Sequence, residues 1–227
     1  MKKILTTLSI AIMASGAFAQ GTLWTLNGAG LLISTNGASI GQGTGSTFGP
    51  NSGGVGSYYF ALLEDNSPTV TGGNVTGLSA NPTDTSTWQF SGLYLTNLNN
   101  AAGFVSGGTA VPDSMWAPNT TNAFFVVGWS ANFGNSWGAI YSALTNSVAS
   151  GGNWAQEGYY GVSAVGFGEP GGGSPSLPTP HIWGTSASGQ FTPIPGFTLY
   201  AVPVPEPGSF VLAGLSGLSL LLFRRRK

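Results

Sequence analysis

The chain has 227 residues and very little charge: six residues are basic, seven are acidic and none is cysteine. Without cysteine it can form no disulfide bond and cannot be a lipoprotein anchored through a modified thiol. All six basic residues lie at the two ends, as Lys2, Lys3 and residues 224–227, so the positive charge is confined to the termini.

The N-terminus has the pattern of a secretory signal peptide. Lys2 and Lys3 precede an uncharged apolar run, and residues 17–19 read Ala-Phe-Ala, the small-x-small pattern that signal peptidase cleaves. An ordinary N-terminal helix is the alternative, but this run has no polar face and Gly16 interrupts it. We therefore predict a signal peptide over residues 1–19, recognised through Ala17 and Ala19.

Residues 20–202 form the predicted passenger domain, which is long enough for one sizeable core. Between Gln20 and Pro205 there are six acids and no base, so the passenger has a side-chain charge of about −6. The acids are Glu64, Asp65, Asp84, Asp113, Glu157 and Glu169. Binding to nucleic acid is excluded, because contacts to phosphate depend on lysine and arginine.

The passenger consists of short β-prone runs separated by turn residues, which predicts an all-β fold, either a β-sandwich or a jelly-roll. No segment keeps a helical apolar period over three turns, and residues 153–157 could form at most a single helical turn. The predicted strands are residues 22–27, 30–34, 57–63, 87–90, 93–96, 123–129, 137–141, 159–165 and 197–200. Residues 168–180 are too rich in proline for a sheet interior.

Two motif matches with catalytic or cofactor spacing fail on their context. Residues 166–171 have the glycine spacing of a dinucleotide loop, but the glycines and prolines after them cannot open the helix that would bind phosphate. Ser39 has nucleophile-elbow spacing, with Asp84 or Asp113 and His181 later in the chain, but no helix pattern comes after it. We predict no catalytic residue, no cofactor and no metal.

The acids and the tryptophans leave two further alternatives open. Glu64 and Asp65 could bind calcium at a strand end, although a solvated turn is the simpler interpretation because Asn-Ser-Pro comes next. Tryptophans among uncharged polar residues suit stacking on sugar rings, with core packing as the competing interpretation. These tryptophans are Trp88, Trp116, Trp129, Trp137, Trp154 and Trp183.

The C-terminus combines three elements in a fixed order. Val204-Pro205-Glu206-Pro207 comes first, an uncharged apolar stretch over residues 209–223 is second, and Arg224, Arg225, Arg226 and Lys227 close the chain. As a helix the apolar stretch spans about 22 Å, short for a bilayer core of about 30 Å, but snorkelling of the basic residues can close the gap. A plain tail anchor is the alternative interpretation.

These three elements resemble the PEP-CTERM sorting signal, over residues 203–227. The resemblance implies recognition by exosortase, a membrane protease or transpeptidase, through Val204, Pro205, Glu206 and Pro207. Residues 209–223 would be a transient inner-membrane helix and Arg224 to Arg226 the stop signal. It also implies delivery to the cell surface or beyond, in bacteria that make exopolysaccharide.

The sequence thus predicts an exported surface or matrix protein with a structural or interaction role and no enzymatic activity. The passenger could contact polysaccharide. The alternative is a secreted carbohydrate-binding module or carbohydrate-active enzyme.

Overall fold

The computed structural model describes residues 20–36, 46–47, 57–66, 78–98, 103–173, 177–186 and 191–203. These residues form mostly strands, which confirms the predicted all-β class. The strands are β1 (Gly21–Leu23), β2 (Ser34–Thr35), β3 (Ser46–Thr47), β4 (Tyr58–Asp65), β5 (Trp88–Asn97), β6 (Val105–Ser106), β7 (Val111–Asp113), β8 (Asn122–Ser130), β9 (Tyr159–Val162), β10 (Gly166–Gly168) and β11 (Thr198–Ala201). The helices are the 3₁₀-helix η1 (Ala131–Phe133) and the α-helix α2 (Trp137–Ala149).

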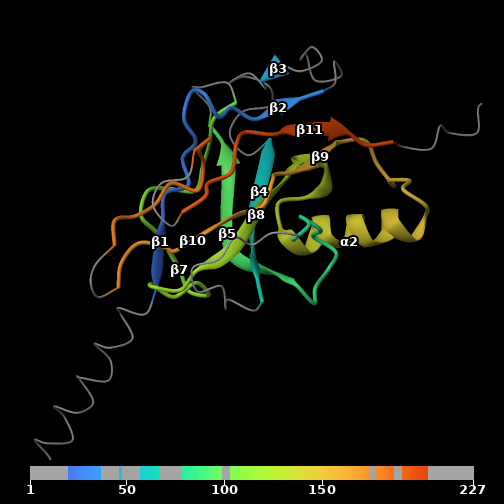
Figure 1. The fold of residues 1–227 in the computed structure, drawn as a ribbon. Helices are drawn as coiled ribbons and strands as arrows, with labels where there is room; N and C mark the ends of the chain where they lie inside the picture. The colour runs from blue at the N-terminus through green and yellow to red at the C-terminus, as the bar shows by residue number, and fades with distance from the viewer. Residues whose placement is uncertain are drawn as a thin grey trace, which may run out of the picture.

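One large sheet organises the described residues, in the strand order β3-β2-β11-β9-β8-β4-β5-β6, with β10 also paired to β8. The neighbours are antiparallel except β11 and β2, which run parallel. β1 and β7 pair with each other in a second, two-stranded sheet. Figure 1 shows β1 and β7 on one side of the large sheet and α2 on the other.

β8 is the centre of the structure because all nine of its residues are buried. Phe124 and Val126 lie in a core shared with Leu23 of β1, so two sheets face each other there, as in a sandwich. The alternate residues Phe125 and Val127 lie in a second core, which α2 covers. Both faces of the strand are therefore apolar, and the period-2 alternation of polar and apolar residues is lost.

The helix α2 corrects the sequence prediction, which assigned residues 137–141 to a strand and expected no long helix. Its buried face is narrow and consists of Ile140, Leu144 and Ser147, at helical spacing, so only two of its three buried residues are apolar. The hydroxyl of Ser136 caps the first turn by accepting a hydrogen bond from the amide of Ala139. Small polar residues between the apolar positions hid this period in the sequence.

Several predicted boundaries also change in the structure. The predicted strand at residues 30–34 reduces to the two residues of β2, while residues 87–90 and 93–96 join into the single strand β5. Residues 153–157 form no helical turn. The long runs 57–63 and 123–129 are confirmed as β4 and β8, each within one or two residues.

Gly128 shows why a glycine stands in the most buried strand. A Cβ atom there would lie 2.6 Å from Cε1 of Phe60 and 2.8 Å from Cδ2 of Leu199. Both neighbours belong to the first core, and neither has room to move in a closely packed interior.

We expect Gly128→Ala to lower the free energy of unfolding by about 1–3 kcal/mol, the usual cost of overpacking a core. Urea denaturation followed by tryptophan fluorescence would measure it. Gly138→Ala is the matched control, since Gly138 lies in α2 with nothing within 4 Å of its Cβ position. That change should raise stability by up to about 1 kcal/mol through helix propensity. Equal effects of the two changes would contradict the packing argument.

Candidate functional site

The structure places five of the six candidate tryptophans in the cores. Trp88, Trp116, Trp129, Trp154 and Trp183 are all at most 8% exposed. Their indole N–H groups serve the fold, since those of Trp116, Trp129 and Trp183 each donate to a backbone carbonyl. For these five residues the core interpretation is confirmed and that of an exposed sugar platform is wrong.

Trp137 is the exception, and it belongs to a group of aromatic residues at the surface. It opens α2 and is half-buried, with its ring 5.8 Å from that of Phe90 in β5, at an interplanar angle of 26°. Tyr141, one turn along α2, lies 5.8 Å from Trp137 between ring centroids. Tyr94 adds a fourth ring, 4.8 Å from Phe90 and 39% exposed. A strand and a helix distant in sequence thus supply one row of rings.

Phe90, Trp137 and Tyr141 line a shallow groove of about 280 Å³, which we call the aromatic groove. Its other lining residues in the described part of the chain are Pro82, Thr85, Trp88 and Gln89, and none of these is charged. The Tyr94 hydroxyl accepts a hydrogen bond of 2.8 Å from the amide of Trp137 and joins β5 to the start of α2. Such a surface suits an uncharged ligand with an apolar face and hydroxyl edges.

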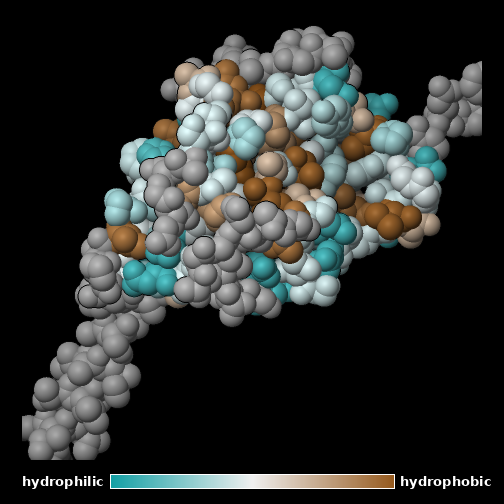
Figure 2. Space-filling view, in the orientation of Figure 1, coloured by the Kyte–Doolittle hydropathy of each residue, from teal (hydrophilic) through white to brown (hydrophobic). Residues whose placement is uncertain are grey.

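Apolar surface continues along the outside of α2. Val148, near the end of the helix, is 67% exposed. In Figure 2 a group of apolar side chains lies over this end of α2. Scattered exposed apolar residues are ordinary on a protein surface, so this end of the helix adds no site by itself.

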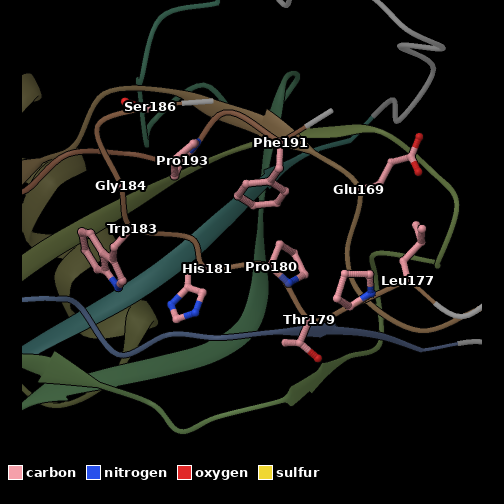
Figure 3. Close-up of a pocket in the computed structure, with 11 residues that line it drawn as sticks. Glu169, Leu177, Thr179, Pro180, His181, Trp183, Gly184, Ser186, Phe191 and Pro193 are labelled. Carbon is pink, nitrogen blue, oxygen red and sulfur yellow. The ribbon is translucent and has the colours of Figure 1, made fainter. Parts of the chain in front are cut away.

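A larger pocket of about 660 Å³ lies between the segment 177–186 and the residues around Phe191. Figure 3 shows Trp183 and Gly184 at one end of it and Glu169 and Leu177 at the other. His181 lines the middle, and its ring stacks on Trp24 at 4.6 Å between centroids. Of the described residues that line it, three are prolines, and the titratable ones are His181 and Glu169.

The structure does not assemble the triad considered from the sequence. Asp113 is fully buried and accepts hydrogen bonds from the amides of Met115 and Trp116. The Asp84 carboxylate accepts from Ser86, whose hydroxyl lowers the pKa of Asp84. Ser39 lies outside the described residues, and among those described no hydrogen bond joins His181 to either aspartate.

The dinucleotide-loop spacing also has a structural explanation. Gly166 and Gly168 belong to β10, which pairs with the start of β8. Gly171 exchanges two backbone hydrogen bonds with Thr22, at 2.9 and 3.0 Å. A Cβ atom at Gly166 would lie 2.7 Å from the Phe124 ring, so close packing requires glycine there.

Glu64 contradicts the prediction of a solvated turn. It is fully buried, near the end of β4, and its carboxyl group contacts that of Asp113 in the facing sheet. Burial, together with the neighbouring Asp113 carboxyl, raises the pKa of Glu64 to about 10. Glu64 is therefore a neutral acid at pH 7, and no sequence pattern indicates this because the partner is 49 positions away.

The predicted sorting and cleavage residues lie outside the described residues. These are Ala17, Ala19, Val204, Pro205, Glu206, Pro207, Arg224, Arg225 and Arg226. The same holds for the predicted membrane helix at 209–223, and the part of the chain that the structure describes contains no helix long and apolar enough to cross a membrane. Within the described ranges, no three histidine, aspartate or glutamate side chains come together as a metal site.

The fold and its surfaces define an all-β domain, and a comparison with known families identifies the segment at its C-terminal end. The family model of the PEP-CTERM protein-sorting motif matches residues 203–227, which confirms the resemblance seen in the sequence. The motif makes this chain an exported protein sorted by exosortase, with a C-terminal membrane anchor before processing. No curated protein and no solved structure matches the chain.

The raised pKa of Glu64 predicts that stability falls as pH rises. The folded protein keeps a proton on Glu64 up to about pH 10, whereas the unfolded chain releases it near the ordinary value of 4.5. Between these values the free energy of unfolding should fall by up to about 1.4 kcal/mol per pH unit. Urea denaturation at pH 5, 7 and 9, in EDTA, would measure the slope.

Glu64→Gln should remove most of this slope, because glutamine stays neutral and can still donate to Asp113. Its stability should match the wild type near pH 5 and exceed it at pH 9. Glu157→Gln, at an exposed acid, should leave the slope unchanged. Parallel profiles for the wild type and Glu64→Gln would show that Glu64 is not the group responsible.

Proposed function

We propose that this chain is a cell-surface or extracellular-matrix protein whose passenger has a non-catalytic role in binding exopolysaccharide. The sorting motif supports the location, because it marks an exported chain. The aromatic groove supports the ligand class. The observation that carries the proposal is the groove's half-buried rings of Phe90, Trp137 and Tyr141, with no charged side chain among the described residues that line it.

The groove suits a neutral polysaccharide for two physical reasons. Aromatic faces stack on the apolar faces of sugar rings, while Gln89 and Thr85 offer uncharged hydrogen-bond partners at the side. The groove is also smaller than the roughly 300–1,000 Å³ of pockets that enclose a whole small ligand. A long chain crossing the groove would contact it with one part at a time and remain largely in solvent.

The charge of the passenger selects among polysaccharides. Six acids and no base between Gln20 and Pro205 repel an anionic polymer at low ionic strength. A neutral glucan meets no such barrier. Contact with the matrix is therefore expected through neutral sugar segments.

Trp137→Ala should weaken binding of a neutral β-glucan by about two- to tenfold, since one stacked ring contributes roughly 0.5–1.5 kcal/mol. Isothermal titration calorimetry with the purified full-length protein in detergent would measure this. Tyr200→Ala is the matched control, because Tyr200 is 59% exposed and does not line the groove. The acidic polymer alginate should bind neither variant.

Unchanged glucan binding by Trp137→Ala would refute the groove as the site. The competing function, a carbohydrate-active enzyme, would appear as release of reducing ends from the glucan. Loss of that release in Glu157→Gln or Glu169→Gln would establish catalysis and overturn the non-catalytic proposal. Glu64 is too buried to serve as a catalytic acid in this arrangement.

Replacing Pro205, Glu206 and Pro207 together by alanine should trap the protein in the inner membrane, since these are the predicted recognition residues. Cell fractionation and the intact mass of the surface fraction would measure sorting and both cleavages. Pro195→Ala, at an exposed proline of the passenger, is the control and should be delivered normally. Normal delivery of the triple variant would contradict the assignment of these three residues.

A further inference from the structure

Three polar side chains lie together between the two sheets, and we call them the buried oxygen cluster: Glu64, Asp113 and Asn122. They are 0%, 0% and 1% exposed. Apart from the contact between the Glu64 and Asp113 carboxyl groups, four of their oxygens are buried without a hydrogen-bond partner: Oε1 and Oε2 of Glu64, Oδ2 of Asp113 and Oδ1 of Asn122. Unpartnered buried oxygens are rare in proteins, and an ion or water between them is a common explanation.

The strand register brings these oxygens together. Glu64 in β4 lies opposite Phe124 in β8, so both side chains point to the same face of the sheet. Asn122 is two residues before Phe124 and therefore points to that face too, as a diagonal neighbour of Glu64 within reach of its long side chain. Asp113 comes from β7 in the facing sheet and contacts the Glu64 carboxyl group.

The remaining polar atoms of the cluster are already occupied, which leaves the four oxygens for a ligand. Asp113 Oδ1 accepts from the amides of Met115 and Trp116, at 2.9 and 3.2 Å. Asn122 Nδ2 donates to the carbonyl of Asp65 at 3.5 Å, so its Oδ1 is the free end of the amide. Once Glu64 is ionised, none of the four oxygens can donate a hydrogen bond, so a ligand that joins them must offer hydrogen-bond donors or positive charge.

We propose that Glu64, Asp113 and Asn122 bind a calcium ion that joins the large sheet to the β1–β7 sheet. Calcium takes carboxylate and amide oxygens, and a glutamate can bind it with both of its own. Binding of calcium displaces the proton from Glu64 into solvent, and the two carboxylates then match the charge of one divalent cation. No lysine or arginine between Ile4 and Phe223 could neutralise them instead.

Calcium fits this cluster better than magnesium. Magnesium requires near-ideal octahedral geometry and keeps several waters, which suits an open site. Calcium takes six to eight oxygens in an irregular arrangement, so backbone carbonyls or water would complete the four oxygens from these three strands. Extracellular calcium modules bind with dissociation constants of about 10⁻⁴–10⁻³ M, the range in which an exported protein would be filled outside the cell.

The proposal is tested on the full-length protein in detergent at pH 7, by thermal unfolding in EDTA and in 10 mM calcium chloride. Saturation of a site in the affinity range above should raise the midpoint by about 5 °C. Magnesium chloride at the same concentration should raise it less. A midpoint unaffected by calcium would overturn the proposal and leave a shared proton as the group that joins Glu64 and Asp113.

Terbium luminescence gives a second, direct measurement. The amide of Trp116 contacts Asp113, so excitation of tryptophan should sensitise terbium bound in the cluster, and calcium should displace it. Glu64→Gln and Asp113→Asn each keep the shape of the side chain but remove a carboxylate. Both should therefore abolish the terbium luminescence and the shift of the unfolding midpoint in calcium. Asp84→Asn, at a surface acid, is the matched control and should keep both.

Asn122→Asp distinguishes the loss of an ion ligand from a simple packing defect, and it does so even if Glu64→Gln and Asp113→Asn fold poorly. A third carboxylate should tighten calcium binding if the side chain of residue 122 is a ligand, and the gap between the midpoints in calcium and in EDTA should widen. A variant that is destabilised equally in both buffers would overturn the assignment of Asn122.

Discussion

The passenger must satisfy its buried polar groups without a single lysine or arginine, and this constraint accounts for much of its structure. Amide and hydroxyl side chains take the role that ion pairs have elsewhere. Asn27, which is 2% exposed, donates to the carbonyls of Leu31 and Gly103 and accepts from the amide of Val105. Two segments, residues 27–31 and 103–105, are thus joined by one neutral side chain, at no cost of burying a charge.

The same constraint explains why the buried acids stand out. A carboxyl group that enters this core meets no cationic side chain, so it must be held by backbone amides, by a proton or by a metal ion. Asp113 uses the first solution through Met115 and Trp116. Glu64 has no backbone donor among the hydrogen bonds of the described residues, which leaves a proton shared with Asp113, or the cation proposed above, to hold it.

Local sequence patterns predict the elements whose signal is local, and they fail where the signal depends on tertiary contacts. The uninterrupted apolar runs of β4 and β8 predicted buried strands, and the terminal elements predicted the sorting motif. The helix α2 is not predicted because its aromatic start favours a strand, and its Ser136 cap acts only once the helix forms.

The aromatic groove is predicted only in part. Trp137 is a candidate from the sequence, but its partners Phe90 and Tyr141 depend on the packing of α2 against β5. No sequence pattern could pair Glu64 with Asp113.

The last described residues bear on how the chain meets its processing enzyme. The amide of Val202 donates to the carbonyl of Gly158, and the carbonyl of Pro203 accepts from the amide of Trp154. The folded domain is therefore anchored up to Pro203, and Val204 alone separates it from Pro205 in the sequence. Two residues of fully extended chain span roughly 7 Å. The sequence therefore leaves almost no spacer between the folded domain and the motif, so an enzyme that reads the motif on the folded protein must tolerate the bulk of the domain beside it.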